Sequence, residues 1–600
     1  MRRLLYFLIL FVLFPIHSLY AISTQVNLHA WGLTRPQEIG FLYLSRLEDP
    51  PRMFIYDIRR VSPLFRTLTK PHSKKPLLQR GVFEVDSFEE PKPNSLGGFT
   101  ETFAKESALS EISFLSERDY GLIFDYQKDS DSFAGLIVYL VNFSLPPEQR
   151  TYLDASSTSF LTFWIKGENE NEEIDLGFVD YDLYLKQDSA LVGPISSFLP
   201  SAHITKEWQQ VWVPIKSVPT SIKLNQLASL VFQAKAPHQG RVFIRDLAFT
   251  ASKNIISKKT PLHIPESSKQ PNFAFWVWET SPILKRQKKS SDLVEFCKQN
   301  QVSDLFFQIP ADFDSLLPQL KDLIHQLNSI QVKLHGLDGN PHFIEPQNRE
   351  KAFSSLKKVI AYNQKNPKEK FYGFRYDNEP YLLEHFHNKH RQKTLKNYLS
   401  FIQEAKTLTH KAGLTLGMDL PFWFDNLNEF FEPPLSVHSK LFIERIIDFV
   451  DNLAIMDYRT HPFGAAGILE SARVELQYAA SKGKKVFVGL ETSKIEDETL
   501  MQFTESGPHT DPNNCIRIYS VKEDLVQIEL PPWSSKEAPD TQVLCALQVT
   551  PVSGNQISSY NHGQEALKKT IEDSLPYFSR FKSFAGFAIH SYESFQVLRK

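Results

Sequence analysis

Cysteine is rare in this 600-residue chain, which contains only Cys297, Cys515 and Cys545. Three cysteines cannot form a dense disulfide framework, which excludes a small disulfide-stapled scaffold. Net charge is also nearly absent, because 67 Lys and Arg residues oppose 69 Asp and Glu residues. This balance gives no electrostatic case for binding nucleic acid or an anionic membrane. Beyond the N-terminus, no apolar run is long enough to span a bilayer.

The N-terminus carries the features of a targeting segment. Two arginines, Arg2 and Arg3, precede an apolar run over residues 4–16 that is too short to cross a bilayer comfortably. Small residues around Ala21 offer a cleavage site. We therefore predict a secretory signal peptide over residues 1–21 rather than an uncleaved anchor. The mature protein is expected to be exported, periplasmic or extracellular, with no membrane span after cleavage.

The N-terminal half of the mature chain has an all-β pattern. Residues 22–80 form an irregular lead-in that we expect to pack on the domain C-terminal to it. Over residues 81–251, short apolar or aromatic runs recur between turn residues, which predicts a β-sandwich of the jelly-roll kind. Residues 252–271 are expected to form a linker. The chain has 47 Phe and 21 Tyr residues, and this aromatic content suits β-structure.

Five stretches of the sandwich segment resemble galactose-binding-like modules: residues 85–90, 94–98, 161–167, 207–214 and 242–249. The resemblance implies a carbohydrate partner for this domain. It also implies a structural calcium ion near the first and last strands, with Glu89 and Asp246 as its ligands, and no other cofactor. Trp164, Trp208 and Trp212 are interpreted as core residues in preference to a sugar-stacking platform.

From residue 272 to residue 600, short apolar strands alternate with helical patterns. Eight strands are expected, over residues 273–278, 304–309, 332–336, 371–376, 414–418, 450–456, 485–490 and 584–589. This alternation predicts a (β/α)₈ barrel. Residues 505–560 form an insertion after strand seven, bracketed by Cys515 and Cys545, and a disulfide between these two is left open. Cys297 is expected to be a buried thiol on a helix.

Acids and aromatics recur where the expected strands end. Because parallel barrel strands display their ends on one face, residues far apart in sequence should meet there. A purely structural barrel has no reason to gather carboxylates at one axis, since like charges repel and raise one another's pKa. The candidate site residues are Trp276, Trp278, Asp338, Asp377, Asn378, Glu379, Asp419, Trp423, Tyr458, Arg459, Glu491 and His590.

Two strand ends resemble retaining glycosidases that carry a catalytic glutamate on strands four and seven. These are Asn378-Glu379-Pro380 and Gly489-Leu490-Glu491-Thr492. The resemblance implies a double displacement, with Glu379 as general acid/base and Glu491 as nucleophile. Such a pair needs its carboxyl groups ~5 Å apart, with one of them protonated. Asn378 would then bind a sugar hydroxyl, and Tyr458 would orient Glu491.

The remaining candidates are expected to hold the sugar. Trp276, Trp278 and Trp423 would stack on it, and Asp338, Asp419, Arg459 and His590 complete the expected substrate-binding set. Arg459 is also a candidate structural partner for Asp457 or Asp419. The sequence departs from the retaining pattern at strand two, where Gln308 stands in place of the usual Arg.

A second resemblance is to chitinases. Asp377 lies two residues before Glu379, and Met456-Asp457-Tyr458 is similar to the strand-six motif of that family. The resemblance implies a substrate-assisted reaction in which Glu379 is the acid, Asp377 positions an N-acetyl group and Glu491 only binds. The sequence departs from this pattern at Arg375 and Arg459.

Two further interpretations concern activity and metal. The barrel is also compatible with a catalytically inactive carbohydrate-binding envelope protein, in which it survives as a recognition surface. No catalytic metal is expected, because His335, Asp338 and His590 lack the local spacing of metal ligands.

Overall fold

The chain is described here by a computed structural model. It describes residues 72–599 with gaps, the longest being 254–270, 425–440, 505–514 and 530–541. Of the first 71 residues it describes only the backbone of two strands, so the predicted signal peptide lies outside the described residues. In the part that is described, no helix combines the length and apolarity needed to cross a bilayer.

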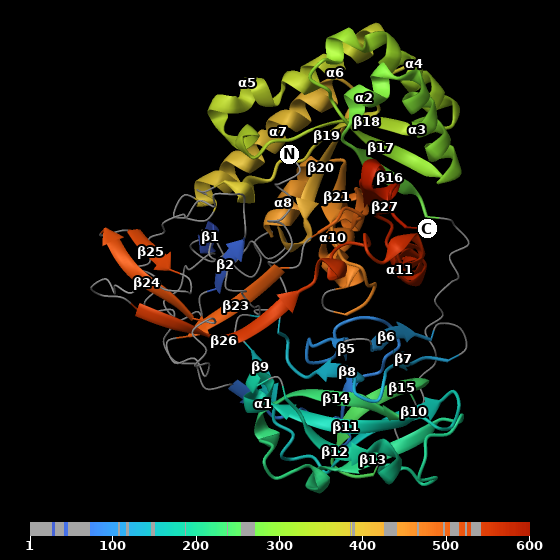
Figure 1. Ribbon diagram of the computed structural model, residues 1–600, viewed down its shortest axis with the longest axis vertical. Helices are drawn as coiled ribbons and strands as arrows, with labels where there is room; N and C mark the ends of the chain where they lie inside the picture. Colours follow the sequence, from blue (N-terminus) through green and yellow to red (C-terminus); the bar gives the residue numbers. More distant parts are fainter. Residues whose placement is uncertain are drawn as a thin grey trace.

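The N-terminal domain is a sandwich of two sheets that are antiparallel except for the pair β3 and β9 (Figure 1). One sheet has the order β13-β10-β15-β7-β6 with β4 beside β15, and the other has β12-β11-β14-β8-β5 with β9 and β3 at its side. The strands are β3 His72–Lys74, β4 Val82–Asp86, β5 Thr100–Ala104, β6 Leu109–Phe114, β7 Leu122–Gln127, β8 Ala134–Tyr139, β9 Thr151–Leu153, β10 Phe160–Gly167, β11 Glu173–Asp180, β12 Ala190–Pro194, β13 Gln209–Pro214, β14 Leu227–Ala236 and β15 Gln239–Thr250. A short helix, α1 (Tyr181–Lys186), follows β11. Alternate residues of each strand fill the space between the sheets, as in the edge-to-face contact of Phe163 with Phe232.

The three tryptophans of the sandwich do not lie in its core. Trp164, Trp208 and Trp212 are all half-buried and stand apart from the core cluster. In β10 and β13 the period of two sends Phe163 and Val211 inward, so Trp164 and Trp212 face outward. The expectation that these tryptophans are core residues is therefore wrong.

A third sheet joins two segments that are distant in the sequence. Its order is β1-β2-β23-β26-β24-β25, and β2 pairs with β23. Its strands are β1 Asn27–Ala30, β2 Phe41–Ser45, β23 Glu498–Thr504, β24 Cys515–Lys522, β25 Leu525–Glu529 and β26 Gln542–Val552. The lead-in thus contributes strands and is not merely irregular. Cys515 lies opposite Cys545 in the backbone register, but both side chains fall outside the described residues, so the disulfide stays open.

The C-terminal part contains a closed barrel of eight parallel strands, as predicted. The strands are β16 Phe273–Val277, β17 Val302–Gln308, β18 Lys333–Asp338, β19 Gly373–Tyr376, β20 Thr415–Pro421, β21 Asn452–Met456, β22 Lys485–Glu491 and β27 Phe584–His590. They are apolar runs because both of their faces are buried. The ring closes where β27 pairs with β16.

Helices follow each barrel strand along the chain (Figure 1). They are α2 Thr280–Lys285, α3 Gln287–Gln299, α4 Leu317–Ser329, α5 Arg349–Ala352, α6 Ser354–Lys365, α7 Arg391–Lys411, α8 Phe442–Phe449, α9 Ile468–Ser471, α10 Arg473–Lys482, α11 Gly563–Phe578 and α12 Tyr592–Phe595. Their apolar faces cover the strands, and Cys297 on α3 is a buried free thiol, as expected.

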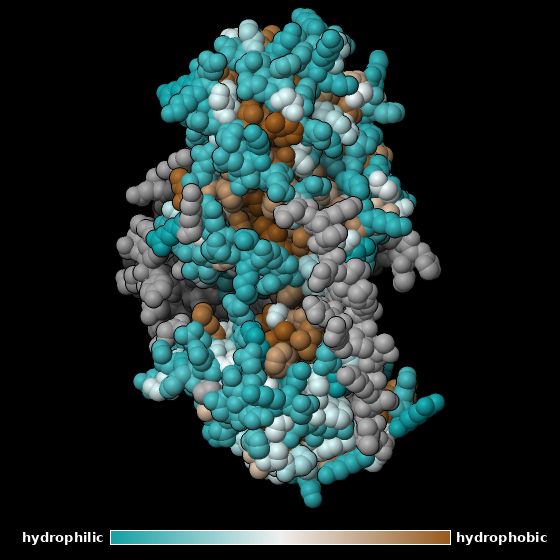
Figure 2. All heavy atoms as spheres, turned by 90° about the vertical axis from the view of Figure 1, so that its right-hand side faces the viewer, coloured by the Kyte–Doolittle hydropathy of each residue, from teal (hydrophilic) through white to brown (hydrophobic). Residues whose placement is uncertain are grey.

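The sandwich contacts the barrel directly. The Phe114 ring of β6 meets Phe463 edge to face, with 5.3 Å between ring centroids. Lys569 on α11 forms an ion pair with Glu111 on β6. Figure 2 shows one face of the molecule, largely hydrophilic, with its hydrophobic residues gathered around the middle and over the barrel.

Candidate active site

The interior of the barrel is filled by one alternating row of residues on each strand. Trp276, Phe306, Leu337 and Phe487 belong to this interior cluster. Because side chains alternate along a strand, residues at even spacing from these also face the axis. At the strand ends this row contains Trp278, Asp377, Asp419, Tyr458, Glu491 and His590, with Glu379 two residues beyond Asp377.

Asp377 and Glu379 lie at the end of β19 and are partly exposed, so solvent reaches them. Loss of hydration in the surrounding protein raises the pKa of Glu379 to about 7, although the hydrogen bond from Tyr381 and the nearby His590 oppose this rise. Burial also raises the pKa of Asp377 well above its ordinary value, and the charges of Glu379 and Asp419 add to this effect. Among the described residues, Oδ1 of Asp377 has no hydrogen-bond partner. The two carboxyls can therefore hold protons near neutral pH, which suits a general acid.

Asp419, at the end of β20, is anchored beneath these two carboxyls. The indole N–H of Trp276 donates to Oδ2 of Asp419 over 2.9 Å, and Arg375 forms a buried ion pair with Oδ1. The Arg375 guanidinium also bonds the Asn452 side chain and lies 3.9 Å from the centroid of the Phe306 ring. Trp276 and Asp419 are almost completely buried, so they support the site from below.

Glu491, at the end of β22, has both carboxylate oxygens occupied. Oε1 accepts the backbone N–H groups of Thr492 and Ser493 over 2.8 and 2.6 Å. Oε2 lies 3.0 Å from Nδ1 of His590, and the Glu491 side chain is 0% exposed. The other imidazole nitrogen, Nε2, accepts the indole N–H of Trp278 over 3.0 Å. Burial lowers the pKa of His590, but the charges of Glu491, Glu593 and Asp419 outweigh it and the net shift is upward.

Tyr458 joins the two groups of carboxyls. It is buried on the inward-facing row, with its ring centroid 5.8 Å from that of His590. After burial, the nearby Glu491, Asp377, Asp419 and Glu379 contribute most to raising its pKa. All four carboxyls therefore lie around one phenol.

Other predicted site residues lie away from this centre. Asp338 lies on the outward side of β18. It accepts the backbone N–H of Gly339, with the Ser355 hydroxyl and the Lys351 charge nearby. Asn378 also points out of the row, and its Oδ1 accepts the backbone N–H of Asn340.

Trp423 and Arg459 both contact neighbouring aromatic rings. Trp423 is buried against the Tyr381 ring, with 5.2 Å between centroids, and has almost no exposed surface. Arg459 donates to the carbonyl of Tyr458 and lies over the Phe422 ring, with Asp457 as its nearby charge. Their predicted roles toward substrate stay predictions.

Sequence reasoning missed three supporting residues. Arg375 is visible in the sequence only as a departure from a motif, because a charged residue inside a strand gives no sign of its buried partners. Tyr381, whose hydroxyl donates to Glu379 over 2.6 Å, directly follows the Asn378-Glu379-Pro380 motif. Glu593 accepts the backbone N–H of Trp278 over 2.8 Å, and only the closure of β27 onto β16 brings them together.

The described residues offer little to a metal ion. Within them, no group of three or more His, Cys, Asp or Glu residues is placed to hold one. Asp246, an expected calcium ligand, instead accepts the Tyr120 hydroxyl at both oxygens and lies 3.6 Å from the Arg245 guanidinium. Asp246 therefore already has a hydroxyl donor and a neighbouring guanidinium charge, and the calcium ion on Glu89 and Asp246 stays a prediction.

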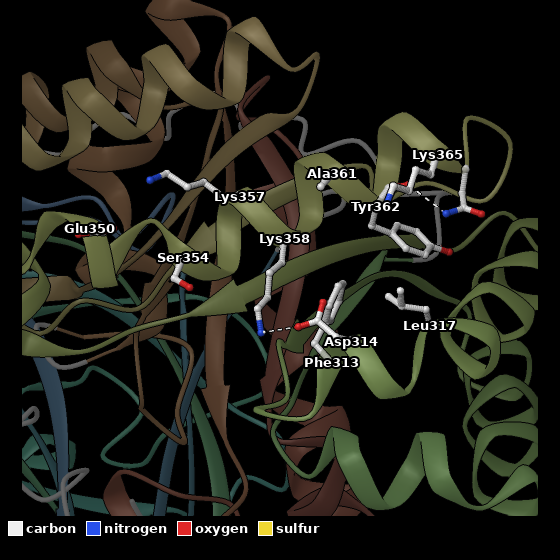
Figure 3. Close-up of a pocket in the computed structure, with 11 residues that line it drawn as sticks. Phe313, Asp314, Leu317, Glu350, Ser354, Lys357, Lys358, Ala361, Tyr362 and Lys365 are labelled. Carbon is white, nitrogen blue, oxygen red and sulfur yellow. Dashed lines mark hydrogen bonds and ion pairs between the residues drawn. The ribbon is translucent and has the colours of Figure 1, made fainter.

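A surface hollow of about 400 Å³ lies on the helical wall of the barrel (Figure 3). It is lined by residues before and on α4, such as Asp314, and by one face of α6, such as Lys358. These two form an ion pair of 3.1 Å across it. None of the predicted site residues lines this hollow.

Comparison with known families identifies one segment of the chain. Residues 143–251 match carbohydrate binding domain 30 (CBM30). This segment covers β9 to β15, most of the sandwich. No curated protein matches the chain. The protein thus combines a region similar to carbohydrate-binding domains with a closed parallel barrel.

Several solved structures are also similar in part. A family 30 carbohydrate-binding module of a cellulosomal cellulase from Clostridium thermocellum is 18% identical, with 29% of this chain and 99% of that chain covered and a TM-score of 0.22. A two-module endo-1,4-β-D-xylanase (CBM22-1 and GH10) from the same organism is 10% identical over 69% and 82%, with a TM-score of 0.24. A chitinase from Chromobacterium violaceum is 12% identical over 55% and 97%, with a TM-score of 0.27. At these TM-scores the likenesses decide neither fold nor function.

Proposed function

We propose that the protein is an exported glycoside hydrolase in which a (β/α)₈ barrel cleaves glycans with Glu379 as the general acid. The observation that carries this proposal is the pair of partly exposed carboxyls at the end of β19. A general acid works best when its pKa lies near the working pH, and the pKa of Glu379 is raised to about 7. The match to a carbohydrate-binding domain supports a glycan as the substrate and an extracellular or envelope location.

Of the two mechanisms that the sequence leaves open, the geometry favours substrate assistance. A nucleophile must reach the anomeric carbon, but the Glu491 side chain is 0% exposed and both its oxygens accept hydrogen bonds. Asp377 instead is partly exposed, adjoins Glu379 and has a buried oxygen without a partner among the described residues. The proposed substrate class is therefore an N-acetylated glycan, as the chitinase resemblance implies.

In the proposed reaction, the acetamido oxygen of the sugar attacks the anomeric carbon. The bond from this carbon to the leaving oxygen breaks, and the proton of Glu379 goes to that oxygen. Asp377 holds the acetamido N–H in place. The bond between the acetamido oxygen and the anomeric carbon closes a five-membered ring beside the sugar. Water then attacks the anomeric carbon, breaks this bond and gives a proton back to Glu379. Two displacements at the same carbon retain the anomer.

The test is a screen of full-length protein against N-acetylated and plain glycans, with the product anomer followed by NMR. Glu379→Gln should lower turnover by roughly 10²–10⁴-fold and leave glycan binding intact. Glu470→Gln is a matched control, because Glu470 pairs with Arg473 away from the barrel mouth. If Glu379→Gln keeps full activity, or if the wild-type protein binds glycans without cleaving any, the hydrolase proposal fails and the protein is a binding protein.

A further inference from the structure

Glu491 forms one end of a hydrogen-bonded chain that crosses from β22 to β16. It binds Nδ1 of His590 over 3.0 Å, and Nε2 of His590 binds the indole of Trp278 over 3.0 Å. An indole nitrogen can only donate, so Nε2 of His590 must be the acceptor, and this hydrogen bond keeps the imidazole neutral although the nearby carboxylates raise its pKa. The proton of the neutral imidazole is then on Nδ1, where it points at the Glu491 carboxylate. Glu491 thus selects the His590 tautomer whose Nε2 can accept the hydrogen bond from the Trp278 indole.

The far end of this chain is a fixed aromatic side chain at the mouth of the barrel. Trp278 follows β16 on the inward-facing row, two residues beyond the buried Trp276, and is partly exposed. Its backbone N–H is held by Glu593 over 2.8 Å, while its indole N–H is held by His590. A partly exposed tryptophan whose backbone and indole are both hydrogen-bonded is suited to stack on a sugar ring, because little conformational freedom remains to be lost on binding.

We propose that Glu491 is a positioning residue, which holds His590 in the tautomer that fixes the Trp278 indole as the sugar-stacking wall of the site. Glu491 itself does not react. Its role depends on the proposed hydrolase function only in that the stacked ligand is a glycan. The hydrogen-bonded chain is a property of the protein alone and is measured without substrate.

The decisive comparison is between Glu491→Gln and Glu491→Ala. A glutamine has no charge with which to attack a sugar, and its single oxygen must serve either Nδ1 of His590 or the backbone N–H groups of Thr492 and Ser493. For a positioning residue, we expect Glu491→Gln and Glu491→Ala to raise KM by up to roughly 10–100-fold, the alanine more than the glutamine, and to lower kcat far less. For a nucleophile, both variants lose turnover by about 10⁴-fold or more, and azide rescues Glu491→Ala with an inverted product. That second pattern would overturn the proposal.

The position of the indole is followed by ¹⁹F NMR of full-length protein labelled with fluorotryptophan, with the Trp278 signal assigned from Trp278→Phe. Glu491→Ala and His590→Ala should both shift or broaden this signal, and Glu491→Gln should change it less. The matched control is Asp304→Asn, which breaks a second buried pair in the same barrel, where His335 lies 2.8 Å from Asp304. It should leave the Trp278 signal unchanged.

The two readouts separate the two proposals. If the Trp278 signal is the same in Glu491→Ala, in Asp304→Asn and in the wild type, the positioning role is wrong, whatever the protein hydrolyses. If the signal responds as expected but no glycan is cleaved, the chain of hydrogen bonds holds and the hydrolase proposal fails.

Discussion

The hydroxyl of Tyr381 donates a 2.6 Å hydrogen bond to Oε1 of Glu379. Burial raises the pKa of Glu379 to about 7, and this hydrogen bond holds it below what burial alone would give. A general acid must carry its proton, so the rate of hydrolysis should fall as the pH rises through about 7. Because a donor to the carboxylate favours the charged form, Tyr381→Phe should move this basic limb upward by roughly half to one pH unit.

The measurement is the pH profile of kcat/KM, which reports the free enzyme. Tyr398→Phe is the matched control, since it removes another buried tyrosine hydroxyl that has no hydrogen-bond partner among the described residues. Its basic limb should stay where it is in the wild-type protein. If the basic limb of the kcat/KM profile stays at the same pH in Tyr381→Phe, or moves to lower pH, the assignment of Glu379 as the acid is contradicted.

Asp377 should matter only for substrates that carry an acetamido group. Its replacement by Asn keeps the shape but weakens the hold on the acetamido N–H, and Asp377→Ala removes it. We expect turnover of an N-acetylated glycan to fall by about 10²-fold or more in Asp377→Ala, with a smaller loss in Asp377→Asn. The measurement is kcat on matched oligosaccharides with and without N-acetyl groups. Equal losses on both substrates would contradict substrate assistance.

Much of the architecture could be predicted from the sequence, and the reasons are local. Barrel strands such as β20 and β22 are buried on both faces, so they appear as continuous apolar runs. The turn residue Pro380 directly after Glu379 lies in the loop that follows β19, so the sequence shows that the strand has ended before it. The strand pairing of the lead-in could not be predicted in this way, because β2 and β23 are joined by a register that links Phe41 to Gln502 and has no local signal.

The details of the site depend on contacts that single residues do not reveal. Glu491 could be placed at a strand end, but its partner His590 is decided by the pairing of β22 with β27. In the sequence, Arg375 is only a residue that departs from the chitinase motif. In the structure it is the charged partner of Asp419. The sequence predicts the sandwich tryptophans in the core, whereas they lie outside it, because an apolar residue type does not indicate which face of a strand it occupies.

Removing Arg375 should destabilise the barrel strongly. Arg375 and Asp419 form an ion pair in which both side chains are 0% exposed. In Arg375→Met the Asp419 carboxylate stays buried with only Trp276 as a described donor, and such an uncompensated charge costs about 3–5 kcal/mol. Urea unfolding of the full-length protein measures the change in the free energy of unfolding.

The control for this prediction is Arg241→Met in the sandwich. Arg241 pairs with Asp125, but its side chain is 43% exposed, so the loss should be at most about 1 kcal/mol. If Arg375→Met costs no more than Arg241→Met, then the buried pair does not stabilise the barrel as its burial implies.

The outward-facing tryptophans of the sandwich should contribute to glycan binding. Trp212 on β13 and Trp164 on β10 are half-buried on the outer face of one sheet, and residues 143–251 match a carbohydrate-binding domain. Aromatic faces suit sugar rings because they are rigid and amphipathic. Trp212→Ala and Trp164→Ala, each in the Glu379→Gln background, should weaken retention of the full-length protein on insoluble glycan by roughly 10-fold.

The comparison that decides this point uses the opposite face of the sandwich. Leu191 on β12 is 45% exposed and belongs to the other sheet, so Leu191→Ala removes apolar surface without touching the tryptophans. Its retention should equal that of the Glu379→Gln protein. If the tryptophan variants are retained equally well, binding depends on the barrel mouth or on another face of the sandwich, because removing a stacking surface cannot leave the affinity of that surface unchanged.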